Sequence, residues 1–204
     1  MKKRRLLWII IFLLFVASFL GILFLYFMAV EKSMMSLQQA QGLMQNTAPK
    51  EITVKVFFGN KKMNPGAADC KAVFPVARMI QNDLIVRRRA VEELLKGPTP
   101  GEIEQGYYSS IPGKEEIIEF RERIKKETGQ APYGGDEIKV NSLKVLAGGI
   151  LYIDFSKEMK AYGGGSCRVD AIKAQINETL KQFSKVGHAA ISIEGEPETT
   201  SLQP

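Results

Sequence analysis

The run Gly163–Cys167, Gly-Gly-Gly-Ser-Cys, precedes the strongest helical pattern in the chain. The first turn of a helix presents unpaired backbone N–H groups and a partial positive charge, which bind anions and lower the pKa of a thiol. Cys167 could therefore act as a thiolate nucleophile with His188 as its base. The run lacks the lysine and the glycine spacing of a phosphate-binding loop or a nucleophile elbow, however, so no catalytic residue is predicted. The candidate anion-binding residues are Gly164, Gly165 and Ser166.

Other titratable residues give no pattern typical of an active site. His188 is the only histidine, which excludes a metal site built on several histidines. Asp154 with Asp136 or Glu137 would be the candidate carboxylate pair, but acids at strand ends are commonplace in any soluble domain. The sequence therefore predicts a protein that is not an enzyme and that holds no metal and no cofactor.

The elements that would position these residues follow from hydrophobic periodicity. Strands are predicted at 52–58, 73–80, 138–146, 150–155 and 188–193, and helices at 84–96, 114–128 and 168–184. Gly148-Gly149 indicates a hairpin between two of the strands. Pro75 indicates an edge strand or a short interrupted strand, because proline cannot donate to a ladder. In the last helix Ile172, Ile176 and Leu180 share one face. We expect an α+β domain with one mixed sheet and amphipathic helices packed on one face.

An uncharged apolar segment, 6–30, follows the basic residues at 2–5. As a helix it would reach roughly 37 Å, against about 30 Å for a bilayer core. It is too long for the apolar part of a cleaved signal peptide, and no cysteine follows it as a lipoprotein signal requires. We expect a single transmembrane signal anchor with the N-terminus in the cytoplasm. The predicted organisation is 1–5 cytoplasmic tail, 6–30 anchor, 31–50 linker or stalk, 51–195 extracytoplasmic domain and 196–204 flexible tail.

The charge and the cysteines of residues 31–204 depend on the predicted location outside the cytoplasm. Four of the 28 basic residues precede the anchor, which leaves 24 basic against 22 acidic residues outside and gives no case for nucleic-acid binding. The two cysteines, Cys70 and Cys167, would face oxidising conditions, which favours a disulfide between them. Two buried free thiols are the alternative.

Several segments, read in order, resemble the GerMN domain of spore-germination proteins over about 52–195. The most specific are Leu94–Thr99 and Thr179–Phe183; the others are Val56–Phe58, Cys70–Val73 with Arg78, Ala90–Glu93, Ile111–Pro112, Leu151–Ser156, Gly164–Cys167, Ile176–Glu178 and Ala190–Gly195. The long charged helix at 114–128 departs from the family pattern. The resemblance implies an extracytoplasmic, non-enzymatic α+β domain tethered to a membrane and engaged in assembly or envelope binding.

Two hypotheses follow. The favoured one is a membrane-anchored extracytoplasmic interaction module of the bacterial cell envelope, whose partners are the membrane, other copies of itself or other envelope proteins. The alternative is an envelope ligand-binding domain that uses the turn Gly163–Cys167 as an anion site.

Overall fold

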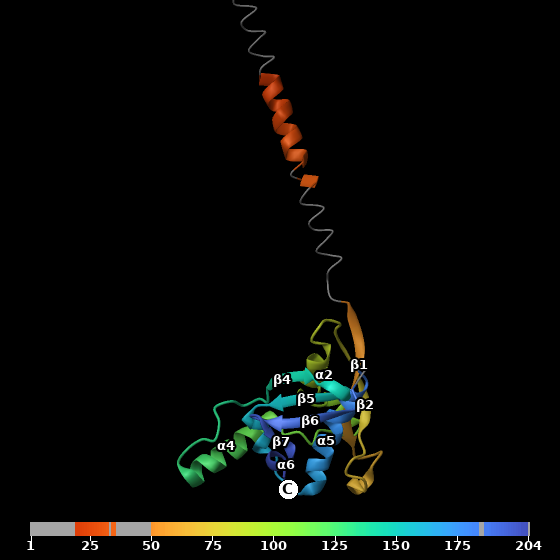
Figure 1. Ribbon diagram of the computed structural model, residues 1–204, viewed down its shortest axis with the longest axis vertical. Helices are drawn as coiled ribbons and strands as arrows, with labels where there is room; N and C mark the ends of the chain where they lie inside the picture. Colours follow the sequence, from red (N-terminus) through yellow and green to blue (C-terminus); the bar gives the residue numbers. More distant parts are fainter. Residues whose placement is uncertain (1–18, 33, 36–49, 184–185, 204) are drawn as a thin grey trace, which may run out of the picture. The chain divides into compact units, whose positions relative to one another are not determined.

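A computed structural model describes the chain in two compact units, 1–49 and 50–204, each considered by itself (Figure 1). The described residues are 19–32, 34–35, 50–183 and 186–203. In the first unit, residues 19–32 are helical and their side chains are exposed. Among the described residues, no helix combines the length and the apolar character needed to cross a membrane.

Much of the predicted N-terminal organisation lies outside the described residues. This holds for the basic tail 1–5, for residues 6–18 of the predicted anchor, and for residues 33 and 36–49 of the predicted linker. The anchor and the linker therefore stay predictions.

The first sheet has the strand order β2-β1-β3. Its strands are β1 (Glu51–Asn60), β2 (Phe74–Gln81) and β3 (Tyr107–Tyr108). β1 and β2 pair antiparallel from Glu51 opposite Gln81 to Phe58 opposite Phe74. Alternate residues of β1 enter the core, namely Val54, Val56 and Phe58. β2 lies at the edge of this sheet, as Pro75 predicts.

The second sheet has the strand order β4-β5-β6-β7. Its strands are β4 (Val140–Val145), β5 (Ile150–Phe155), β6 (His188–Ile193) and β7 (Glu196–Pro197). The predicted hairpin is confirmed, because β4 and β5 pair antiparallel around the short turn Ala147–Gly149. β5 and β6 are parallel, and the helix α5 (Ser166–Lys181) provides the crossover that parallel strands require.

The prediction of one mixed sheet is wrong, because the fold has two sheets. The helices α2 (Val86–Leu95) and α5 pack on each other, and each contacts strands of both sheets. A single cluster of buried residues runs through both sheets and both helices; it includes Val56, Leu94, Ile153, Ile176 and Ile191. Periodicity shows which face of a strand is buried but not which strand pairs with it, so the separation into two sheets had no local sign.

Helix α5 begins two residues earlier than predicted. Gly165 is its N-cap and has an extended backbone, and Gly164 before it has φ +113°, a conformation that favours glycine. The buried residues of the helix include the predicted face: Val169, Ile172, Ile176 and Leu180. The predicted packing of this face into the core is therefore confirmed.

The chain between β3 and β4, residues 109–139, forms an excursion with its own small core. The helix α3 (Pro100–Glu104) precedes β3, and the predicted charged helix, α4 (Lys114–Thr128), follows β3. Gly113 caps the start of α4, and Gly129 ends it in the left-handed conformation, φ +78°. A small cluster of Ile117, Tyr133 and Ala161, separate from the main core, fastens α4 to the short 3-10 helix η3 (Lys157–Ala161).

The C-terminal residues are ordered, so the prediction of a flexible tail at 196–204 is wrong for the described residues. β7 extends the second sheet, and the short helix α6 (Glu198–Ser201) contacts β6. Leu202 is only 2% exposed and belongs to the main core. One apolar side chain in a polar segment has no periodicity, which is why the sequence pattern missed this packing.

Candidate functional site

Gly164, Gly165 and Ser166 lie together at the exposed start of α5. Arg168, in the first turn of the helix, donates hydrogen bonds to the carbonyls of Ser110 at 2.8 Å and Gly163 at 3.0 Å. The same guanidinium pairs with Glu116 of α4 at 2.8 Å. Arg168 therefore fastens this turn to the excursion, and its charge is matched by a carboxylate rather than left for an anion.

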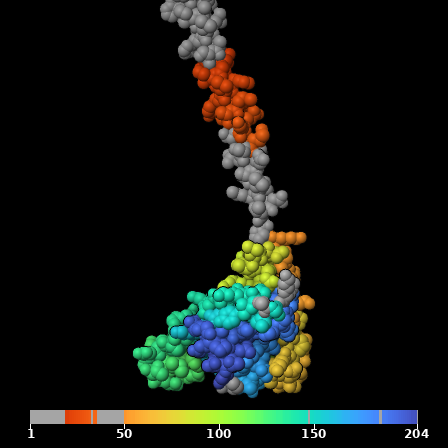
Figure 2. All heavy atoms as spheres, in the orientation of Figure 1, coloured from red at the N-terminus to blue at the C-terminus, as the bar shows by residue number. Residues whose placement is uncertain are grey.

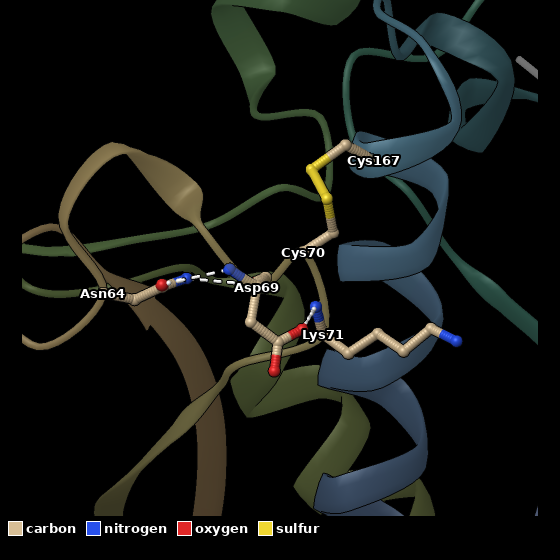
Figure 3. The surroundings of a disulfide bond; sticks show 5 residues. All are labelled: Asn64, Asp69, Cys70, Lys71 and Cys167. Carbon is tan, nitrogen blue, oxygen red and sulfur yellow. Dashed lines mark hydrogen bonds between the residues drawn. A yellow bond between two sulfur atoms is a disulfide. The ribbon is translucent and has the colours of Figure 1, made fainter.

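Cys167 cannot act as a nucleophile, because it forms the predicted disulfide with Cys70; their Cα atoms are 5.0 Å apart (Figure 3). The loop that carries Cys70 is ordered by Asn64, whose side chain donates to the carbonyl of Asp69 and accepts from its N–H. The Asp69 carboxylate in turn accepts the N–H of Lys71. The bond joins the loop before β2 to the first turn of α5, so it ties the first sheet to the crossover helix.

His188 and Cys167 are also separated by the fold. Cys167 lies in the first turn of α5, whereas His188 begins β6, after the far end of that helix. Sixteen helical residues span about 24 Å. His188 is exposed and starts the parallel pairing with Ile150, which is a structural position.

Asp154 takes part in a structural network on the second sheet. Its carboxylate accepts hydrogen bonds from the Ser192 hydroxyl at 2.5 Å, the Gly195 N–H at 2.8 Å and the Asn141 amide at 3.0 Å. Burial alone would raise the pKa of Asp154, but these hydrogen bonds outweigh it and hold the pKa below its ordinary value. A carboxylate that stays ionised and fully hydrogen-bonded fixes the turn after β6 and is unsuited to proton transfer.

Asp136 and Glu137 line a different region, so they do not form a pair with Asp154. They border an open cavity of about 780 Å³ between the end of α2 and the start of α4. Asp136 pairs with Lys114 there at 2.7 Å, and this contact raises the pKa of Lys114. The cavity includes neither Ser166 nor Cys167. Across the described residues, no group of three or more His, Cys, Asp or Glu side chains could hold a metal ion.

The edge of the first sheet is a more distinctive surface. Within the part of the chain that the structure describes, no strand pairs with the outer side of β2. Four of its residues are exposed and alternate along the strand: Pro75, Ala77, Met79 and Gln81. Unpaired N–H and C=O groups on an exposed edge are a template for another strand, although the carbonyl of Ala77 accepts a hydrogen bond from Arg78 Nη1 at 3.1 Å. This edge is therefore a candidate site for protein–protein contact.

Arg78 fixes the conformation of that edge, and sequence reasoning missed its partner. Its guanidinium donates two hydrogen bonds to the Glu102 carboxylate, at 2.6 and 2.7 Å, and lies 5.9 Å from the centre of the Phe58 ring. The hydrogen bonds to Glu102 outweigh burial and raise the pKa of Arg78. Thr99-x-x-Glu102 is typical of a capping box, and Glu102 accepts the N–H of Thr99, but this local pattern does not reveal that the same carboxylate also binds β2.

Comparison with known sequences identifies one family. Residues 55–199 match the family described as "Germane: Sporulation and spore germination". This match covers more than half of the chain and nearly all of the second compact unit. No protein of curated function matches the sequence.

Solved structures similar to this chain include GerMN domains. The tandem GerMN domains of the sporulation protein GerM from Bacillus subtilis match with 18% identity and a TM-score of 0.47, over 72% of this chain and 41% of theirs. The first GerMN domain of the same protein gives 19% identity and a TM-score of 0.43, over 72% of this chain and 85% of that one. The chain thus spans about two fifths of the tandem-domain structure.

Proposed function

Because the chain belongs to the Germane, or GerMN-type, family of sporulation and spore germination domains, we propose that it is a non-enzymatic interaction module of the bacterial cell envelope. In this proposal the segment 6–30 holds the chain in the cytoplasmic membrane and the compact unit 50–204 lies outside the cytoplasm. Its partners are further copies of itself or other envelope proteins. Confinement to a membrane raises the effective concentration of such partners, so weak contacts suffice.

The observation that carries the proposal is the exposed edge of β2. An edge strand of eight residues with small or flexible exposed side chains, such as Ala77 and Met79, leaves room for a second strand. Arg78 holds the strand in place through Glu102, so the edge is presented in a fixed conformation before any partner binds. Pre-organisation of this kind lowers the entropic cost of association.

The alternative is an envelope ligand bound at the turn Gly163–Cys167. The cavity of about 780 Å³ between α2 and α4 does not include that turn, and neither does a smaller cavity of about 310 Å³ beside α4. The positive charge of Arg168, next to the turn, is also neutralised by the carboxylate of Glu116. We therefore favour assembly, and a tightly bound small anion on the purified protein would reverse that choice.

The experiment is a size measurement on full-length protein extracted in a mild detergent, by light scattering. We expect an assembly larger than a monomer, and we expect Ala77→Glu to make it smaller, since like charges across a strand pair are destabilising. Gln130→Glu, which adds the same charge at an exposed position beyond α4, is the matched control and should leave the size unchanged. Monomers under all conditions would contradict self-association and leave other envelope proteins as the partners.

A further inference from the structure

The turn between β2 and α2 holds two large aliphatic side chains in water. Leu84 is 101% exposed and Ile85 is 47% exposed. Their exposure is built in, because the Asp83 carboxylate accepts the N–H of Ile85 at 3.1 Å and the Asp83 carbonyl accepts the N–H of Val86 at 3.2 Å. Arg89 donates two further hydrogen bonds to the same carboxylate, at 2.9 and 2.7 Å. These hydrogen bonds hold the turn in one conformation, in which the side chains of Leu84 and Ile85 project from the surface.

This turn lies where the chain enters the domain. The N–H of Asn82 donates to the carbonyl of Lys50 at 2.8 Å, so residues 82–85 stand beside the first residue of the compact unit. Figure 1 shows the loop between β2 and α2 next to the start of β1, and Figure 2 shows it protruding there in yellow-green. If residues 6–30 hold the chain in a bilayer, the linker attaches the domain at the end that carries Leu84.

Charge around the turn favours an acidic surface. Four basic residues lie in the adjoining segments 50–51 and 82–89, against two acidic ones. The basic residues are Lys50, Arg87, Arg88 and Arg89, and the acidic ones are Glu51 and Asp83. Asp83 is paired with Arg89 at 2.7 Å, and Arg88 with Glu92 of the next helical turn at 3.8 Å, so the positive excess around the turn is small. Exposed aliphatic side chains beside a net positive charge are the features that bind anionic lipid headgroups and enter the interface beneath them.

We propose that this turn docks on the outer surface of an anionic bilayer, with Leu84 and Ile85 entering the interfacial region. The inference rests on the membrane anchoring proposed above. Two aliphatic side chains give only weak membrane binding by themselves, but a tether of 19 residues, 31–49, keeps the turn close to the lipid. Docking would direct β2 away from the membrane surface, because the strand ends at Gln81 just before the turn. The exposed edges of neighbouring copies could then meet side by side.

The test uses tryptophan as a reporter of contact with lipid. Trp8 is the only tryptophan, and it lies in the predicted anchor. Three full-length proteins with one tryptophan each are compared: wild type, Trp8→Phe with Leu84→Trp, and Trp8→Phe with Met63→Trp. Met63 is the matched control, because it is 49% exposed and follows β1 at the end opposite Lys50, roughly 33 Å along the strand. Each is reconstituted in vesicles of phosphatidylcholine and phosphatidylglycerol whose acyl chains carry bromine, a contact quencher.

We expect strong quenching of Trp8, clear quenching at position 84 and none at position 63. Replacing phosphatidylglycerol by phosphatidylcholine should weaken the quenching at position 84 only. Quenching of Trp8 without quenching at position 84 would overturn the docking proposal and leave the anchor in place. An unquenched Trp8 would overturn the anchoring itself, and the docking proposal would fall with it. Equal quenching at positions 84 and 63 would show non-specific adsorption and would also contradict docking by this turn.

Discussion

Arg78 in the middle of the edge strand β2 and Glu102 in the helix α3 form a bidentate pair, with both side chains less than 15% exposed. Glu102 also accepts the N–H of Thr99, so one carboxylate caps α3 and binds β2. The pair is largely shielded from water. In such surroundings charge-assisted hydrogen bonds are strongest, and an unpaired charge is most costly. The edge that we propose as a contact surface thus depends on this pair for its shape.

The first prediction concerns the pH dependence of this pair. The hydrogen bonds from Arg78 hold the pKa of Glu102 below its ordinary value of 4.5. A lowered pKa in the folded state stabilises the protein above pH 4.5, and this stabilisation is lost as the pH falls through the folded-state pKa. Glu102→Gln should therefore lower the unfolding free energy at neutral pH by roughly 1.5–3 kcal/mol.

Urea unfolding at neutral pH and well below pH 4.5 checks this prediction, since the difference between wild type and variant should shrink at the lower pH. Glu104→Gln, at an exposed position of the same helix, is the control and should change little at either pH. A difference that stays constant with pH would mean that the ionised pair contributes nothing to stability.

A second prediction concerns the disulfide. Cys70 and Cys167 are 97 residues apart in sequence, so the bond closes a long loop in the unfolded chain. Replacing both cysteines by serine should lower the unfolding free energy by about 2–5 kcal/mol, measured by denaturant unfolding. Each single replacement should lose a similar amount. Thiol counting on denatured, non-reduced protein from its native compartment should find no free thiol; two reactive thiols would refute the bond.

The third prediction tests the core face of α5. Leu180 is 0% exposed and packs in the main core, so Leu180→Ala should destabilise the protein by roughly 2–5 kcal/mol. Ile103→Ala is the matched control, because Ile103 is 58% exposed, and it should stay within about 0.5 kcal/mol of wild type. Thermal or chemical unfolding gives both values. Similar losses for the two variants would show that the burial of this face has been misassigned.

A fourth prediction concerns topology. The basic cluster at 2–5 ahead of the segment 6–30 predicts that the N-terminus stays in the cytoplasm. An enzyme that is active only outside the cytoplasm, fused after Pro204, should be active in cells. The matching fusion of an enzyme that is active only in the cytoplasm should be silent. The reverse result would place the domain inside and remove the basis for a disulfide formed in an oxidising compartment.

Local features of this fold could be predicted from the sequence, because they depend on neighbours in the chain. The 3.6-residue stripe through Ile176 predicts α5, Gly148-Gly149 predicts the β4–β5 hairpin, and Pro75 predicts an edge strand. Each involves residues within a few positions of one another, where geometry leaves few alternatives. The compartment inferred from the segment 6–30 was enough to suggest the pairing of Cys70 with Cys167.

Features that depend on distant residues could not be predicted. Arg89 has Glu93 at the spacing of a helix pair, yet it binds Asp83, because the turn before α2 brings that carboxylate within 2.7 Å. Glu93 instead pairs with Lys96 at 2.5 Å. The separation into two sheets and the burial of Leu202 likewise arise from packing across the domain. The candidate anion site failed to gain support for the same reason, since Glu116 reaches Arg168 from a helix 52 residues away in sequence.

The central claim, assembly through β2 at the membrane, is tested most directly by photo-crosslinking in the native membrane. A photo-reactive amino acid replaces Ala77 on the exposed edge of β2 or, as a control, Glu119 on the exposed side of α4, and the native disulfide is retained. We predict a discrete crosslinked product from position 77, either a dimer of this chain or a complex with one envelope protein, and none from position 119. No product from position 77, or the same products from both positions, would contradict the account.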